Sequence, residues 1–265
     1  MKIQLFIAFL LFGTNSICQS TIKIPLKTVV GLRMLAYINP CVIQKVDTLV
    51  KYKGIPAGYE YSRIGHIVFQ REQYLYWKYK TNQITKQMLI DRMGNDIRDT
   101  LMLSNQPIRC YTVVFIGLKQ NKKTIIVDTN GNDDFSDETE IQYDQDFSTI
   151  DYQTDSTLHL IPASKVKYEV FQNGKIHSRS KWLKVKPFDS SYGFGKDTLM
   201  QKIMVYGVGF EHKEGHFNIQ NRKFRLIVNS TGFNKDNYKS FNVNLQRDSV
   251  EYSRFGFVKQ GVVFE

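Results

Sequence analysis

The stretch KVKYEVFQ-NG-KIHSRSKWLKV, residues 165–185, decides the fold of this chain. Two runs of valine, aromatic and interspersed polar residues flank the dipeptide Asn173-Gly174. Asn-Gly tolerates the two positive φ angles of a type I′ turn, whose twist matches that of the paired strands. The stretch therefore predicts an antiparallel β-hairpin.

Short apolar or alternating runs separated by turn residues recur on both sides of this hairpin, at 110–118, 124–127, 140–143, 240–246 and 250–257. The 265 residues include 15 Tyr and 18 Phe, which favour strands. We expect a mainly β protein of antiparallel sheets, arranged as a sandwich or barrel, with one or two short helices.

The segment between residues 72 and 93 is ambiguous in its pattern. Tyr74, Tyr76 and Trp77 suit a strand, whereas residues 82–93 suit a short helix. We therefore expect one helix near 82–93.

The length and the 42% hydrophobic content suffice for one large domain or two smaller ones. The polar, irregular segment 144–164 is the natural place for a boundary. We expect a β-rich region at 19–150 and a hairpin-rich region at 151–265, with one continuous domain as the alternative.

The N-terminus has the pattern of a signal peptide, residues 1–18, with Lys2 before the apolar run 3–12. Cleavage before Gln19 fits the small residues that precede it; a lipidated Cys18 is the alternative, although Ile17 suits it poorly. No later segment reaches 18 apolar residues, so we expect no transmembrane segment. The protein should be exported: periplasmic, outer-envelope-associated or secreted.

Two cysteines follow the signal segment, Cys41 and Cys110. An oxidising compartment permits a disulfide between them, but two separate buried thiols explain them equally well. The chain contains no Cys-x-x-Cys sequence, which excludes a thioredoxin-type redox centre.

Charge is distributed unevenly along the chain, which has a formal net charge of +11. Residues 124–164 contain ten Asp or Glu and no Lys or Arg. Ten carboxylates in a short segment repel one another unless a cation lies among them. This segment is therefore the first place to expect a cation site.

The acidic loop DTNGNDDFSDE, residues 128–138, follows the spacing of an EF-hand calcium loop. Such loops place oxygen ligands at alternate positions around a sharp turn. The metal ligands that we expect are Asp128, Asn130, Asn132, Asp134, Asp137 and Glu138. With these ligands in an exported protein, calcium affinity should be on the order of 10⁻⁴ M, and magnesium fits less well.

Two positions of the acidic loop depart from the EF-hand pattern. Asp133 occupies position six, where glycine is expected, and Thr139 occupies position twelve in place of glutamate. The sharp turn could instead fall at Gly131. A plain Asn130-Gly131 turn with solvated acids is the alternative to a calcium site. Phe135 is too apolar to stay exposed and should anchor the loop on the core.

The signal peptide, the strand-rich segments and the sequence VDTNGNDDFSD at 127–137 together resemble the uncharacterised β-rich regions that precede thioredoxin-like domains in exported bacterial proteins. The resemblance is specific over about twenty residues around the acidic loop. It implies an EF-hand-like calcium loop carried on strands. The Cys-x-x-Cys domain of those proteins is absent from this chain.

Seven basic side chains cluster on the predicted hairpin: Lys165, Lys167, Lys175, Arg179, Lys181, Lys184 and Lys186. With Trp182 beside them, they could bind an anionic envelope polymer. The alternative is a solvated strand face that discourages edge-to-edge pairing. Because we expect export, nucleic acid is not an expected partner.

Catalytic and zinc signals are weak. His212 and His216 have the spacing of helical zinc ligands, but Lys213-Glu214-Gly215 indicates a hairpin tip where both would be solvated. Known catalytic motifs are missing from the sequence. We expect a non-catalytic, exported calcium-binding β protein with a binding or envelope role; the alternatives are an accessory part of an exported hydrolase or redox system, or an adhesin.

Overall fold

The structure is a computed structural model, which describes residues 23–31, 38–45, 52–93, 103–147, 156–188, 198–219, 221–230, 241–247 and 250–251. The expected signal peptide at 1–18 and its Cys18 lie outside these residues.

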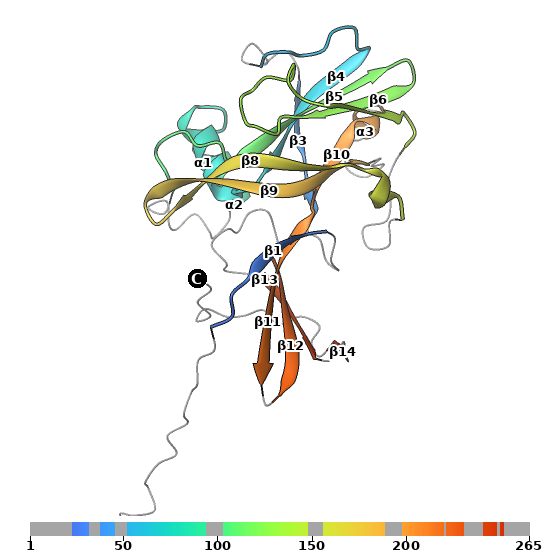
Figure 1. Ribbon diagram of the computed structural model, residues 1–265. Coiled ribbons are helices and arrows are strands. Elements are labelled where there is room, and N and C mark those ends of the chain that lie inside the picture. The colour runs from blue at the N-terminus through green and yellow to red at the C-terminus, as the bar shows by residue number, and fades with distance from the viewer. Residues whose placement is uncertain are drawn as a thin grey trace, which may run out of the picture.

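Three antiparallel sheets and a few short helices make up the described fold (Figure 1). The loop sheet contains, in spatial order, β3 (Val42–Lys45), β4 (Tyr61–Val68), β5 (Tyr111–Lys119), β6 (Lys122–Val127) and β7 (Glu140–Asp144). The hairpin sheet contains β2 (Ile38–Pro40), β10 (Met204–Gly209), β9 (Lys175–Phe188) and β8 (Ala163–Gln172). The third sheet contains β1 (Lys27–Val30), β11 (Glu211–Ile219), β12 (Arg222–Ser230), β13 (Phe241–Arg247) and β14 (Val250–Glu251).

The helical elements are α1 (Arg71–Lys80), α2 (Lys86–Met93), α3 (Thr198–Lys202) and a 3₁₀ turn at Ser156–Leu160. The prediction of a mainly β, sandwich-like fold with short helices is confirmed. None of the described helices has the length and hydropathy needed to span a membrane.

The loop sheet and the hairpin sheet face each other across the main hydrophobic core. Val114 and Ile116 of β5 pack in this core with Val166 of β8 and Leu183 of β9, all fully buried. Burying each such side chain stabilises the fold by about 1.5–3 kcal/mol. Strands from both sides of residue 150, where we placed a candidate boundary, therefore share one core.

The other face of the loop sheet is covered by α1 and by the acidic loop. Val113 and Phe115 of β5 pack there against Tyr74 of α1 and Phe135 of the loop. Because both faces of β5 are covered, its sequence is almost continuously apolar instead of alternating.

Tyr74, Tyr76 and Trp77 suited a strand in the sequence pattern, but this indication is wrong because all three lie in α1. Tyr74 and Leu75 are buried, at 3% and 6% exposure, and Leu75 packs with residues of α2. The β propensity of aromatic residues reflects packing on a half-buried surface, and a helix lying on a sheet supplies such a surface too. The helix expected near 82–93 is α2.

The Asn-Gly hairpin prediction is confirmed in detail. Asn173 and Gly174 have φ angles of 51° and 74°, both in the left-handed region that the turn requires. The turn joins β8 to β9, and the pairing closes with Gln172 opposite Lys175.

The turn expected at Lys213-Glu214-Gly215 is wrong, because β11 runs through these residues without interruption. Gly215 lies opposite Leu226 of β12, and a Cβ there would sit only 2.5 Å from Cγ2 of Ile24. The glycine therefore allows the segment before β1 to pack closely on the strand. His212, expected to be solvated, is buried at 6% exposure.

Cys41 and Cys110 are both free and buried, so the disulfide alternative does not apply. They belong to different hydrophobic clusters: Cys41 lies in the core between the sheets, and Cys110 lies in the cluster on the outer face of the loop sheet. Burial raises the pKa of the Cys110 thiol to about 12, so it remains protonated at neutral pH.

Candidate metal site in the acidic loop

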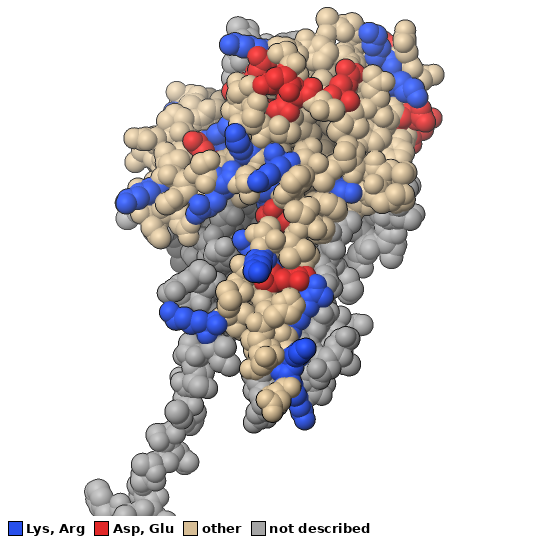
Figure 2. Space-filling view, viewed as in Figure 1, with Lys and Arg blue, Asp and Glu red and all other residues tan. Residues whose placement is uncertain are grey.

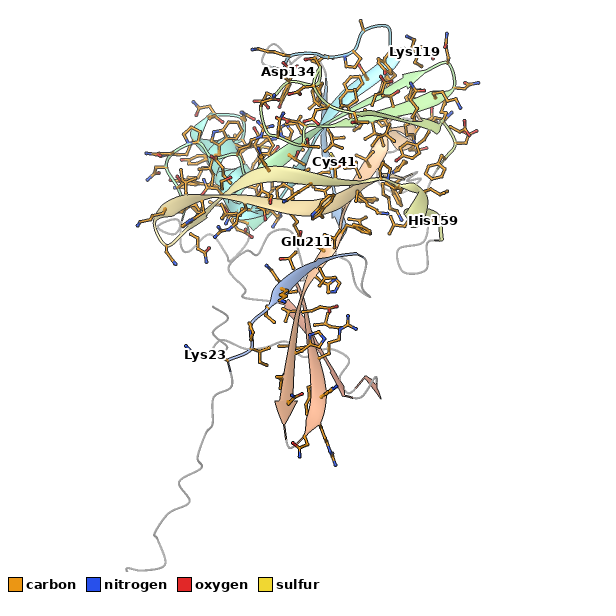
Figure 3. All side chains as sticks on the ribbon, in the orientation of Figure 1. Lys23, Cys41, Lys119, Asp134, His159 and Glu211 are labelled. Carbon is orange, nitrogen blue, oxygen red and sulfur yellow. The ribbon has the colours of Figure 1, made fainter. Side chains whose placement is uncertain are left out.

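The acidic loop connects β6 to β7 and folds back over the outer face of the loop sheet. Phe135 anchors it, with 3% exposure and ring centroids 6.1 Å from Phe115 and 6.2 Å from Tyr52. The main chain of Lys53 pairs with the loop as well: its N–H donates to Asp133 O at 2.8 Å, and its O accepts from Phe135 N at 3.0 Å. The prediction that Phe135 anchors the loop is confirmed, and Figure 3 shows Asp134 beside the segment that leads into β4.

The backbone of the loop takes the left-handed conformation at two positions. Gly131 has φ 80° and Asp133 has φ 61°. Asp133 is position six of the EF-hand spacing, where glycine normally permits the sharp turn. Asp is among the few residues that adopt this conformation at modest cost. The turn at position six is therefore retained without its glycine, and Gly131 adds a second turn.

Side-chain oxygens at alternate positions fold the loop around itself. Oδ1 of Asn130 accepts from Asn132 N at 2.9 Å, and Oδ1 of Asn132 accepts from Asp134 N at 2.8 Å. Oδ1 of Asp134 accepts from Ser136 N at 2.9 Å. The hydrogen bonds from Ser136 hold the pKa of the Asp134 carboxyl below its usual value.

Three of the six expected ligands come together at one point. Oδ2 of Asp137 accepts from Nδ2 of Asn130 at 2.9 Å and from Nδ2 of Asn132 at 2.8 Å. All three side chains are exposed, so this point is open to solvent ions. The asparagines meet Asp137 through their Nδ2 groups, while their Oδ1 oxygens accept from backbone N–H groups. A hard cation would therefore take its oxygens from Asp137 and from the second Oδ1 lone pairs of Asn130 and Asn132.

The other expected ligands face different partners. Asp128 is fully buried, and its two oxygens accept from Gly131 N at 2.8 Å and Asp133 N at 3.1 Å. Glu138 accepts from Thr129 N at 2.6 Å, which turns its carboxylate toward the start of the loop. Among the residues that the structure describes, no three His, Cys, Asp or Glu side chains are arranged to hold a metal ion.

Arg109 contacts two carboxylates of the loop, and the sequence pattern did not indicate it as a residue of this site. Its guanidinium donates to Asp128, and to Oδ1 of Asp133 at 2.7 Å. Burial alone would lower the pKa of Arg109, but the hydrogen bond to Asp133 and the charges of both carboxylates raise it above its ordinary value. Arg109 thus neutralises the buried part of the loop from within the protein. It lies 19 residues before Asp128, which is too far along the chain for the spacing of the loop to indicate it.

Backbone contacts also join the loop to the free edge of β8. Lys167 N donates to Thr129 O at 2.8 Å, and Glu169 N donates to Arg109 O at 2.7 Å. The carboxylate of Glu169 in turn accepts from Arg109 N at 2.8 Å. The acidic loop therefore closes the edge of the sandwich beside the basic hairpin.

A buried tyrosine–histidine network lies next to the anchor of the loop. Nε2 of His66 is 2.9 Å from the Tyr52 hydroxyl, and Nδ1 is 2.8 Å from the Tyr74 hydroxyl. The imidazole also stacks on Tyr111, with ring centroids 4.4 Å apart. No sequence spacing indicated a partner for His66, because these tyrosines come from three separate segments. The network therefore connects Tyr52, which contacts the loop anchor Phe135, to β4 and α1.

The predicted basic cluster is only partly a surface. Lys165, Lys167, Lys175 and Arg179 are exposed, whereas Lys184 and Lys186 are buried, which corrects the prediction. Nζ of Lys184 donates to Leu158 O at 2.8 Å, and burial lowers its pKa. Figure 2 shows the exposed Lys and Arg over β8 and β9, with acidic side chains above them.

The two histidines considered for zinc do not form a helical pair, because both lie on strand β11. Nε2 of His212 is 2.7 Å from Oε1 of Glu214, whose other oxygen accepts from Arg225 Nε at 3.1 Å. His216 is exposed. Asp144 is an exposed partner of Lys122 at 2.5 Å.

No protein family, curated protein or solved structure matches this chain.

Proposed function

We propose that the acidic loop binds one calcium ion, which orders the loop in an exported β protein without catalytic activity of its own. The observation that carries the proposal is the convergence of Asn130, Asn132 and Asp137 within a loop whose position six keeps the left-handed conformation. An alternating set of amide and carboxylate oxygens around such a turn is the donor set of an EF-hand loop.

The residues present fit a calcium ion at the exposed end of the loop. Asn130 and Asn132 each use one lone pair of Oδ1 for a backbone N–H, which leaves a second lone pair for an ion. Asp137 supplies the negative charge there, and Asp134 lies between them in sequence. The inner end already has its cation, since Arg109 serves Asp128 and Asp133. Calcium accepts six to eight oxygens in flexible geometry, so solvent can complete a partial set of ligands.

The role that we propose for the ion is structural. Phe135 and Lys53 link the loop to the outer face of the loop sheet, so an ordered loop protects the buried cluster beneath it. At 10 mM calcium, a dissociation constant on the order of 10⁻⁴ M corresponds to about 2.7 kcal/mol of added stability. For a chain of this size the melting temperature should rise by about 5–10 °C.

The test is a thermal melt of chelated protein with and without 10 mM calcium, repeated on Asp137→Asn. We expect the rise in wild type and its loss in Asp137→Asn. Asp146→Asn is the matched control, because Asp146 is an exposed acid of the same segment outside the loop. Equal melting temperatures with calcium and with EDTA would contradict the proposal.

A second part of the proposed function concerns a partner. The exposed cations of the β8–β9 hairpin support binding of an anionic envelope polymer, and an envelope or binding role for the protein as a whole. Salt-sensitive retention on an anionic matrix tests this part independently of calcium, and retention that does not change with salt would contradict it.

A further inference from the structure

We propose that the outer face of the hairpin sheet, at Lys165, Lys167 and Trp182, binds an acidic polysaccharide through carboxylate or sulfate groups and sugar rings. This inference deepens the partner that we proposed for the hairpin, and it does not require the calcium site. The observation behind it is that the sheet brings two amines, both without a partner among the described residues, and an indole together on one exposed surface.

The register of the hairpin places these side chains side by side. Lys165 lies directly opposite Trp182, and Lys167 lies directly opposite Ser180. Directly opposite residues share a face, with Cβ atoms about 4.5–5.5 Å apart. Both lysines are exposed, and Trp182 is half-buried. Ser178 and Ser180, both exposed, continue the same face toward the turn.

The charges of this surface have no partner among the residues that the structure describes. Neither the Lys165 nor the Lys167 amine takes part in any ion pair or hydrogen bond of the described residues. Two acids of this region have bonds to other groups: Glu169, two residues after Lys167 on β8, accepts from Arg109 N at 2.8 Å, and Glu211 accepts from Trp182 N at 3.0 Å. Two like charges held two residues apart on one strand repel each other, and a bound anion would relieve that repulsion.

The main chain of Trp182 is held where the chain crosses from one sheet to the next. Its backbone N–H donates to Glu211 at 3.0 Å, and its backbone O accepts from Phe210 N at 2.9 Å. No ring contact joins the indole to another aromatic side chain of the described residues. Its exposed part is therefore available to a ligand.

The chemistry of the face favours a glycan over the other polyanions. A sugar ring presents C–H groups to an indole and hydroxyls to serines, while lysines are suited to its acidic substituents. Nucleic acid recognition on a sheet relies on several stacking aromatics, and this face offers one. A membrane would instead require several apolar side chains to insert between headgroups.

The experiment measures binding of the full chain to heparin, a sulfated polysaccharide, over a range of salt concentrations. The test variant is Lys165→Glu with Lys167→Glu. The control variant is Lys86→Glu with Lys223→Glu, which makes the same change in net charge at exposed lysines elsewhere. We expect the test variant to bind about tenfold more weakly or worse, while the control binds like wild type. The slope of log affinity against log salt should fall by about two in magnitude.

Trp182→Leu distinguishes binding that depends on contact between the indole and a sugar ring from binding that depends on charge alone. We expect heparin fragments to quench the Trp182 fluorescence, and Trp182→Leu to weaken heparin binding without affecting binding of a short DNA duplex or of phosphatidylglycerol vesicles. Equal heparin binding by the two double variants would overturn the assignment of the binding surface to Lys165 and Lys167. An equal effect of Trp182→Leu on DNA or on vesicles would overturn the choice of a glycan. Each measurement is made in EDTA and in calcium. If the loop does not bind calcium, the melting temperature will not rise with calcium, but heparin binding will persist.

Discussion

The acidic loop and the basic face of the hairpin sheet lie next to each other, yet their charges are treated in opposite ways. In the loop, carboxylates accept hydrogen bonds from the backbone, from two asparagines and from Arg109. On the basic face, the amines of Lys165 and Lys167 have no such partners in the part of the chain that the structure describes. Charges that are satisfied internally contribute to stability, whereas unsatisfied surface charges are suited to an external ligand.

The difference in burial explains why the two regions diverge. Asp128 is fully buried, so its charge would be costly without Arg109. Lys165 and Lys167 remain in water, where their desolvation cost is small. The buried end of the loop is therefore part of the folded core, whereas the lysines of the basic face lie at the protein surface.

The largest effect should come from the buried ion pair. Arg109→Ala leaves the Asp128 carboxylate buried and without its cation, so we expect a loss of about 3–5 kcal/mol in the free energy of unfolding. Urea denaturation measures this loss. The control is Lys122→Ala, which breaks an exposed pair, with side chains 52% and 80% exposed, and should cost at most about 1 kcal/mol. Similar losses in the two variants would show that the loop charge is not structural.

The smallest effect should come from the basic face. Lys165→Ala and Lys167→Ala remove exposed amines that have no partner among the described residues, so each should change the free energy of unfolding by no more than about 0.5 kcal/mol. The same urea measurement compares them with Arg109→Ala. A loss of several kcal/mol in either lysine variant would mean that these amines stabilise the fold, and the contrast between the two regions would fail.

The sequence indicated the local parts of the fold well. The Asn173-Gly174 hairpin and the apolar strand β5 were predictable because turn chemistry and short-range patterning determine them. Helix α1 was not, since its Tyr74 is buried against a sheet formed by distant segments. The continuous strand β11 was missed because Gly215 serves close packing with Ile24 and not a turn.

The candidate site divides in the same way. The spacing from Asp128 to Glu138 located the loop and its anchor Phe135, because both are encoded within eleven residues. Arg109 and the partners of His66 could not be found from one sequence, since they meet the site only through tertiary packing.

Calcium titration of chelated protein by isothermal calorimetry tests the central claim, that the exposed end of the loop accepts a cation, most directly. We expect one ion per chain, with a dissociation constant on the order of 10⁻⁴ M, and no binding by Asp137→Asn. No heat of binding in wild type, or unchanged binding in Asp137→Asn, would contradict it.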